Sequence, residues 1–141
     1  MFNPSRDQAR LFFIDAWRKR NEGETLSALE NMAIEIIQQH PEYHPLLTDP
    51  DALQHEFGPE DGQLNPFLHL SLHLAIAEQI SINQPPGIHR LFATLALKRG
   101  DRHAALHDIL DCLGETIFNA QRTRTPPDGQ AYLECVEKKI G

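Results

Sequence analysis

Long apolar segments and an excess of basic charge are both missing from this sequence. No stretch approaches the roughly 20 consecutive apolar residues of a membrane-spanning helix, and the opening MFNPSRDQAR lacks the basic-then-apolar order of a secretory signal. The 13 Lys and Arg stand against 20 Asp and Glu, giving a net charge of -7. That balance disfavours nonspecific attraction to phosphate backbones or anionic lipid. We therefore expect a cytoplasmic protein that binds neither nucleic acid nor membrane.

Cysteine and the common catalytic loops are scarce as well. The two cysteines, Cys112 and Cys135, lack the CxxC or CxxH spacing that would indicate a zinc knuckle or a redox pair. We interpret both as small apolar core residues. The chain also has no glycine-rich phosphate loop, GxSxG elbow or Cys/His nucleophile arrangement. Nucleotide-dependent chemistry therefore has no support, and whether the protein is an enzyme stays open.

Helix signals recur along the chain, whereas no segment alternates with the period of a strand over more than a few residues. A cap residue precedes proline at Asn3-Pro4, Asn65-Pro66 and Thr125-Pro126, which is typical of helix starts. Thr25 is a further candidate cap. Apolar spacing predicts helices over residues 4–21, 26–40, 66–83, 88–98, 102–122 and 126–141.

The segment over residues 41–64 interrupts this helical pattern. It holds six Pro and Gly residues, so we expect a loop-rich connection with a short turn of helix near residues 50–55. A chain of 141 residues is long enough to bury one domain core. The sequence thus predicts an all-α fold, a single-domain antiparallel helical bundle over residues 1–141 with about five to six helices.

Histidine is the residue type that stands out, with eight in the chain. The helix expected over residues 66–83 has no Asp, Glu, Lys or Arg between Phe67 and Ala77, so we expect other helices to surround it. His69 and His73 lie one turn apart on one side of it. A buried polar group without a partner costs about 1–3 kcal/mol. The two imidazoles therefore need a metal ion, a carboxylate, backbone or water to bond.

A second histidine pair has the same spacing. His103 and His107 lie on the helix over residues 102–122, with Asp111 one turn further along. Imidazoles and carboxylates that project inward from facing helices are typical of iron, manganese or zinc sites in bundles. We therefore predict a transition-metal site between the two helices. Its predicted ligands are His69, His73 and His107, with Asp111 or Glu115 completing or orienting the site. Glu78 is less favoured, because it lies about 180° around the helix from His69.

The other histidines have more ordinary interpretations. His40 and His44 stand at the end of the helix over residues 26–40, where His40 can cap carbonyl groups, so they are second-choice ligands. His55 and His89 look like surface residues. An alternative to the metal site also stays open. In it, the central histidines bond only to protein or water, and the chain is a noncatalytic interaction or adaptor protein that presents its helices to a protein partner.

Four segments resemble the bacterial family called domain of unknown function 1841: the block NPFLHLSLHLAIAEQ with QPPGI after it, the opening MFNPSRDQAR, HPEYH, and HAALHDILDCLGETIFNAQR. The resemblance covers nearly the whole chain. The motif corresponds here to Asn65, Pro66, Phe67, His69, His73, Glu78, Gln79, Pro85 and Pro86. It implies a small, single-domain cytoplasmic protein and carries no activity over to this chain.

Overall fold

The computed structural model describes residues 6–54 and 65–141. Within these ranges the regular structure is helical and no strand occurs, so the predicted all-α fold class is confirmed. The chain divides into two compact units, Met1–Leu74 and Ala75–Gly141. Each unit is described separately below, and a single domain over residues 1–141 stays a prediction.

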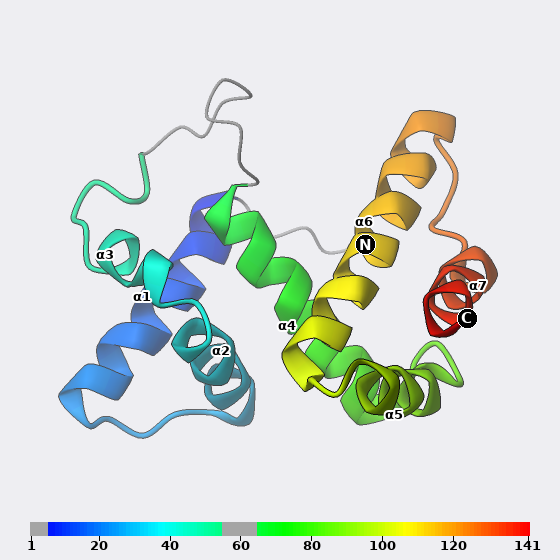
Figure 1. Cartoon of the computed structure of the whole chain (residues 1–141). Helices are drawn as coiled ribbons and strands as arrows, with labels where there is room; N and C mark the ends of the chain where they lie inside the picture. Colours follow the sequence, from blue (N-terminus) through cyan, green and yellow to red (C-terminus); the bar gives the residue numbers. More distant parts are fainter. Residues whose placement is uncertain (1–5, 55–64) are drawn as a thin grey trace. The chain divides into compact units, whose positions relative to one another are not determined.

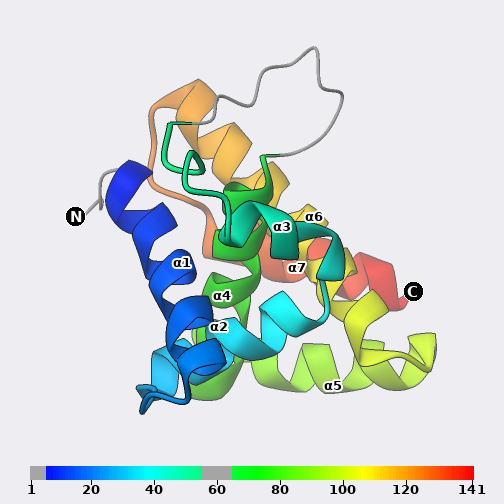
Figure 2. The same cartoon turned by 90° about the vertical axis from the view of Figure 1, so that its left-hand side faces the viewer.

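The first unit is built from two long helices and two short ones, followed by the first half of another long helix (Figure 1). These are α1 (Arg6–Glu22), α2 (Ala28–Gln38), the 3-10 helix η1 (Pro41–Tyr43), α3 (His44–Leu47) and the start of α4 (Pro66–Ile82). Both α2 and α3 pack on α1, as Figure 2 shows. Phe13 and Trp17 of α1 and Ile37 of α2 are buried and form part of its core.

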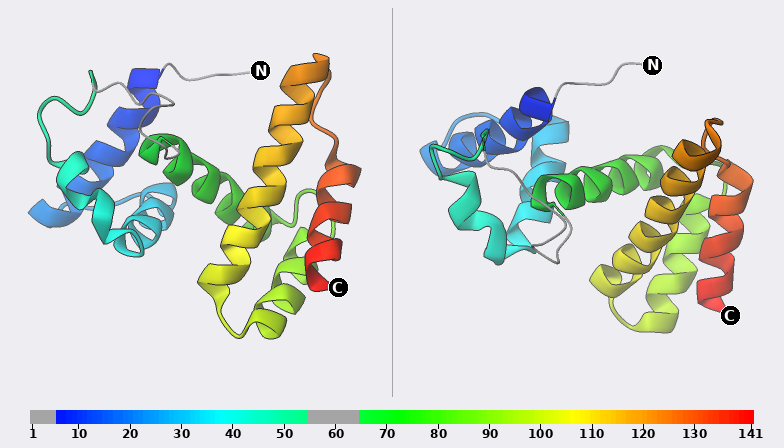
Figure 3. Two further views of the ribbon diagram at one scale, coloured as in Figure 1. Left: turned by 45° about the horizontal axis from the view of Figure 1, so that its top comes forward. Right: turned by 90° about the horizontal axis from the view of Figure 1, so that it is seen from above.

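The second unit contains the end of α4 and three further helices, α5 (Ile88–Arg99), α6 (Arg102–Thr123) and α7 (Gly129–Ile140). Each of these three helices packs on the other two (Figure 3). The core side chains Leu95, Ile109 and Val136, one from each helix, have no exposed surface. The second unit thus contains a three-helix bundle with its own apolar centre.

Helix α4 begins where its sequence signal predicts, but α2 does not. The side chain of Asn65 accepts hydrogen bonds from the backbone N–H of Phe67 at 2.9 Å and of Leu68 at 3.4 Å. Thr25 was expected to cap α2, and this is wrong because Ser27 does so. Ser27 and Glu30 form a reciprocal capping box, which satisfies two backbone N–H groups at once and fixes the start at Ala28.

The expected start of the last helix at Thr125-Pro126 is also wrong. Pro127 follows Pro126 directly, and a residue before proline is disfavoured in the helical region. The helix therefore starts later, at Gly129, with the carboxylate of Asp128 accepting from the N–H of Ala131 at 3.1 Å. The third expected start, Asn3-Pro4, lies outside the described residues.

Short helices occur earlier in the 41–64 segment than expected. Residues 50–54 form turns, whereas η1 and α3 occupy residues 41–47. Pro41 and Pro45 each stand in the first turn of one of these helices, where a missing N–H costs nothing. Helix α3 raises the count from the expected five to six to seven α-helices within the described residues.

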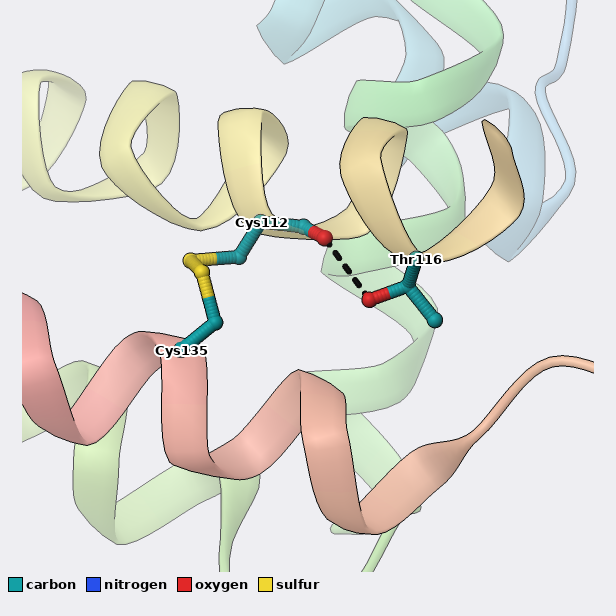
Figure 4. The surroundings of a disulfide bond; sticks show 3 residues. All are labelled: Cys112, Thr116 and Cys135. Atoms are coloured by element: carbon teal, nitrogen blue, oxygen red, sulfur yellow. Dashed lines mark hydrogen bonds between the residues drawn. A yellow bond between two sulfur atoms is a disulfide. The ribbon is translucent and has the colours of Figure 1, made fainter. Parts of the chain in front are cut away.

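The two cysteines are bonded to each other, which corrects their interpretation as separate apolar residues. A disulfide joins Cys112 of α6 to Cys135 of α7, whose Cα atoms are 5.8 Å apart (Figure 4). Beside it, the hydroxyl of Thr116 donates to the carbonyl oxygen of Cys112 at 2.8 Å. No local motif marks this pair, because the packing of α6 on α7 brings together residues that are 23 positions apart.

We predict that replacing Cys112 and Cys135 by alanine lowers the free energy of unfolding of the second unit by about 3 kcal/mol. A crosslink that closes a loop of this length restricts the unfolded chain by that order. Denaturant unfolding followed by amide hydrogen exchange in α7 measures the effect. Reduced wild type should match the variant, and an unchanged midpoint in both would contradict the prediction.

A buried tyrosine makes the second unit sensitive to alkali. Tyr132 of α7 is 2% exposed and donates to Oε1 of Gln79 on α4 at 2.7 Å. Burial disfavours the phenolate, which raises the pKa of Tyr132 above its ordinary value. In the unfolded chain the same phenol ionises near pH 10. The stabilisation from neutral Tyr132 is therefore complete below about pH 10 and is lost as the pH rises further.

We accordingly predict that raising the pH from 9 to 11 destabilises wild type more than the Tyr132→Phe variant, by about 1 kcal/mol. Denaturant midpoints of both proteins at the two pH values measure this difference. Tyr43, whose pKa burial also raises, is present in both proteins and cancels. Equal losses in the two proteins would show that Tyr132 does not cause the alkaline sensitivity.

Candidate metal centre

Three histidines of the first unit meet in one cluster. His40 lies directly before η1, whereas His69 and His73 are one turn apart on α4. Each has a ring nitrogen that could serve as a metal ligand, and these nitrogen atoms all lie within 4.8 Å of one another. We call these three residues the histidine cluster.

The rings of the histidine cluster are in direct mutual contact. The ring centroid of His40 lies 5.0 Å from that of His69 and 4.8 Å from that of His73. The ring centroids of His69 and His73 are 4.8 Å apart. The Nε2 atoms of His69 and His73 are separated by 3.1 Å. His73 is 2% exposed and His40 4% exposed, and His69 is half-buried. The cluster is therefore sheltered from bulk water while leaving one imidazole near the surface.

The local sequence orients His40 within the cluster. Its Nδ1 lies 2.8 Å from the carbonyl oxygen of Ile36, in the last turn of α2. A carbonyl oxygen only accepts, so Nδ1 carries a proton, and in the neutral tautomer Nε2 then carries the lone pair. Metal-binding histidines commonly have their second ring nitrogen fixed in this way. The predicted capping role of His40 is thus confirmed, and the cap also sets the tautomer that a metal ligand needs.

Tyr43 covers one side of the cluster. Its ring is stacked on that of His40, with centroids 5.5 Å apart and planes 3° from parallel, and it meets the His69 ring edge-on at 6.0 Å. Burial, and to a smaller extent the charge of Glu42, raises the pKa of the Tyr43 phenol. Tyr43 is therefore a neutral aromatic wall that restricts water around the imidazoles.

The predicted ligands belong to both compact units of the chain. His69 and His73 are brought together as predicted. His107 belongs to the second unit, where it is half-buried on α6 with its ring 4.2 Å from that of His103. Asp111 and Glu115 of α6 and Glu78 of α4 are exposed residues of the same unit. Metal ligation by His107, Asp111 and Glu115 stays a prediction.

His40 belongs to the histidine cluster, although its position in the sequence made it only a second-choice ligand. Its position after the last turn of a helix was a sufficient signal for a cap, but nothing in the spacing indicated that α4 would meet the same ring. His44, its equal in that ranking, has a structural role. Its Nε2 lies 2.9 Å from the carbonyl oxygen of Ile37. Its ring packs on that of Trp17, with the two ring centroids 4.4 Å apart. His89 is exposed as expected, and His55 lies outside the described residues.

Fold and site together define an all-α protein with a sheltered histidine cluster. The chain belongs to the family described as Domain of unknown function (DUF1841), whose model matches residues 5–138. It matches no curated protein and no solved structure. Every helix in the described ranges is too short or too polar to cross a membrane.

Proposed function

We propose that this protein binds one transition-metal ion through His40, His69 and His73. The observation that carries the proposal is the convergence of three imidazole nitrogens, from two segments remote in sequence, within 4.8 Å of one another. Histidine is the commonest metal ligand among side chains. A sheltered group of three imidazoles is an arrangement suited to a metal.

The distances in the cluster fit a shared ion. Two imidazole nitrogens about 2.0–2.1 Å from one tetrahedral zinc ion lie about 3.3 Å from each other. The 3.1 Å separation between the Nε2 atoms of His69 and His73 is close to this value. The Nε2 lone pair of His40, set by its bond to Ile36, supplies the third donor.

The donor set narrows the predicted metals. Iron, manganese and zinc were all candidates while carboxylates were expected in the site. Imidazole suits zinc and iron, whereas manganese prefers oxygen ligands. Three imidazoles therefore favour zinc or iron over manganese. With three protein ligands and an open fourth position, a bound metal would act as a Lewis acid toward water or a small substrate.

We propose His107 as the fourth ligand. Its support is the spacing of His103 and His107 on α6 and the partial burial of the His107 ring. A fourth imidazole would close the coordination sphere and give a structural site, and an open position would remain without it. Visible absorption of the cobalt-substituted protein separates the two. If His107 is a ligand, His107→Gln will change the spectrum and weaken binding, and an unchanged spectrum would exclude it.

The alternative function is a noncatalytic interaction protein that binds a protein partner, with histidines that only hold the fold. One observation favours it: a hydrogen bond between the Nε2 atoms of His69 and His73, which are 3.1 Å apart, would give both Nε2 atoms a partner without a metal. This interpretation predicts that metal has no effect on stability. The metal proposal predicts a rise in the unfolding midpoint as metal binds.

Metal analysis of protein purified without an affinity tag tests the proposal. We expect about one equivalent of zinc or iron per chain, restored by titration after removal with a chelator. Less than about a tenth of an equivalent, with no uptake of zinc, iron or cobalt on titration, would exclude a metal-binding function.

A cytoplasmic location remains part of the proposal. Disulfides seldom persist in the cytoplasm, where thiol systems keep cysteines reduced. A cytoplasmic location therefore implies that Cys112 and Cys135 are thiols for much of the time. Rapid alkylation of intact cells would trap both as thiols, whereas a fully oxidised pair would place the protein in an oxidising compartment.

A further inference from the structure

A pocket lies beside the disulfide in the second unit. Its volume is about 240 Å³, and its walls come from the C-terminal half of α6, residues 125–128 and the start of α7. Cys135 lines this pocket together with Glu115, Thr116, Asn119 and Asp128. The space is smaller than a typical drug site and suits a molecule of a few heavy atoms. The histidine cluster has no part in it.

The two cysteines of the disulfide differ in exposure. Cys112 is fully buried, with 0% of its surface exposed. Cys135 is half-buried and forms part of the pocket wall. A thiolate must reach a sulfur directly to exchange with a disulfide, so access decides which sulfur is attacked. Cys135 lines the pocket and Cys112 does not, which favours attack at Cys135.

We propose that this pocket is a thiol-exchange site, with Cys135 as the attacked residue. A small thiolate entering the pocket forms a bond to Sγ of Cys135. The bond between Cys135 and Cys112 breaks, and its electron pair leaves on Sγ of Cys112, which then takes a proton from water. The products are a mixed disulfide on Cys135 and a buried thiol at Cys112. The reverse attack by the Cys112 thiolate expels the small thiol and restores the disulfide.

The charge of the pocket selects the class of thiol. Two carboxylates, Glu115 and Asp128, line it, and the described lining residues include no Lys, Arg or His. Thr116 donates its hydroxyl proton to the carbonyl of Cys112, so its oxygen remains as an acceptor. Such walls attract a cation and repel an anion. Small aminothiols should therefore react faster than thiols that carry a carboxylate or sulfonate.

Exchange kinetics of the full-length oxidised protein test the proposal. Cysteamine and mercaptoethanesulfonate are similar in size, and their ammonium and sulfonate groups are opposite in charge. For each thiol, the rate of reaction with the protein is divided by the rate of reaction of the same thiol with a small soluble disulfide, which corrects for its intrinsic reactivity. The reaction is quenched in acid, free thiols are alkylated, and peptides are mapped by mass spectrometry. We expect the adduct on Cys135 and the alkyl group on Cys112. At low salt, the normalised rate for cysteamine should exceed that for the sulfonate by about 10-fold.

Variants separate pocket charge from other causes. The Glu115→Gln/Asp128→Asn variant should lose most of this preference, and asparagine keeps the helix cap at position 128. Glu137→Gln removes an exposed charge from α7 outside the described pocket lining and should keep the preference. About 1 M salt should weaken it in wild type. Adducts mainly on Cys112, or a rate that depends on neither thiol charge nor these carboxylates, would overturn the proposal.

Discussion

Replacing His69 and His73 together by glutamine will abolish metal uptake by the histidine cluster. Binding of a structural zinc ion amounts to about 10–16 kcal/mol. If this free energy is divided equally among four ligands, losing two of them removes at least about 5 kcal/mol. Binding is then weakened by more than about 10³-fold. Glutamine keeps side-chain volume and polarity, so the two rings are lost without leaving a large cavity. Equilibrium titration with zinc or cobalt measures the change.

His89→Gln is the matched control, because His89 is exposed and the hydrogen bond between its Nδ1 and the carbonyl oxygen of Ile80 is long, at 3.4 Å. That variant should bind metal as wild type does. Far-UV circular dichroism and the fluorescence of Trp17 establish that the double variant is folded. If the double variant is folded and still takes up one equivalent with unchanged affinity, the cluster is not the site. If neither protein binds metal and the double variant melts at a lower temperature than wild type, the histidines have a purely structural role.

The histidine pair on α4 could be found from the sequence because it is local. Helical spacing places His69 and His73 on one side, and the absence of charge between Phe67 and Ala77 indicates burial. These are properties of one element and do not depend on its neighbours. The same holds for the cap at Asn65, where the side chain bonds to backbone only two or three residues away.

His40 and the disulfide could not be found in this way, because both depend on which segments meet. His40 contacts His69 of α4, which is remote from it in the sequence, and Cys112 meets Cys135 only when α6 packs on α7. Neither contact has a spacing signature in one chain. Helix starts fail for a different reason. Thr25 and Ser27 are both acceptable caps, and the choice of Ser27 rests on Glu30, which also bonds to Lys19 of α1 at 2.9 Å.

Arg10 is another residue whose role appears only in the folded unit. It lies near the start of α1, in its second turn, and is 2% exposed. Its Nη1 donates to the carbonyl oxygens of Ala52 at 3.0 Å and Leu53 at 3.2 Å. Its guanidinium carbon lies 5.0 Å from the centroid of the Phe67 ring on α4. One side chain thus joins α1 to the turns after α3 and to the start of the helix that carries His69 and His73.

Arg10→Met will lower the free energy of unfolding of the first unit by about 2–4 kcal/mol. Methionine has similar length, but it leaves the carbonyls of Ala52 and Leu53 without their charged donor. Trp17 is the single tryptophan of the chain and belongs to the first unit, so its fluorescence during denaturant unfolding reports this unit directly.

Arg18→Met is the matched control, because Arg18 lies on the same helix with 46% of its side chain exposed and bonds to Glu22 and Glu24. Exposed ion pairs contribute little, so its effect should be small beside that of Arg10→Met. Because Phe67 stands two residues before His69, Arg10→Met should also weaken metal binding when the unit is still folded. If the Trp17 transition moves no further in Arg10→Met than in Arg18→Met, the buried guanidinium does not hold these three segments together. The histidine cluster would then depend on apolar packing alone.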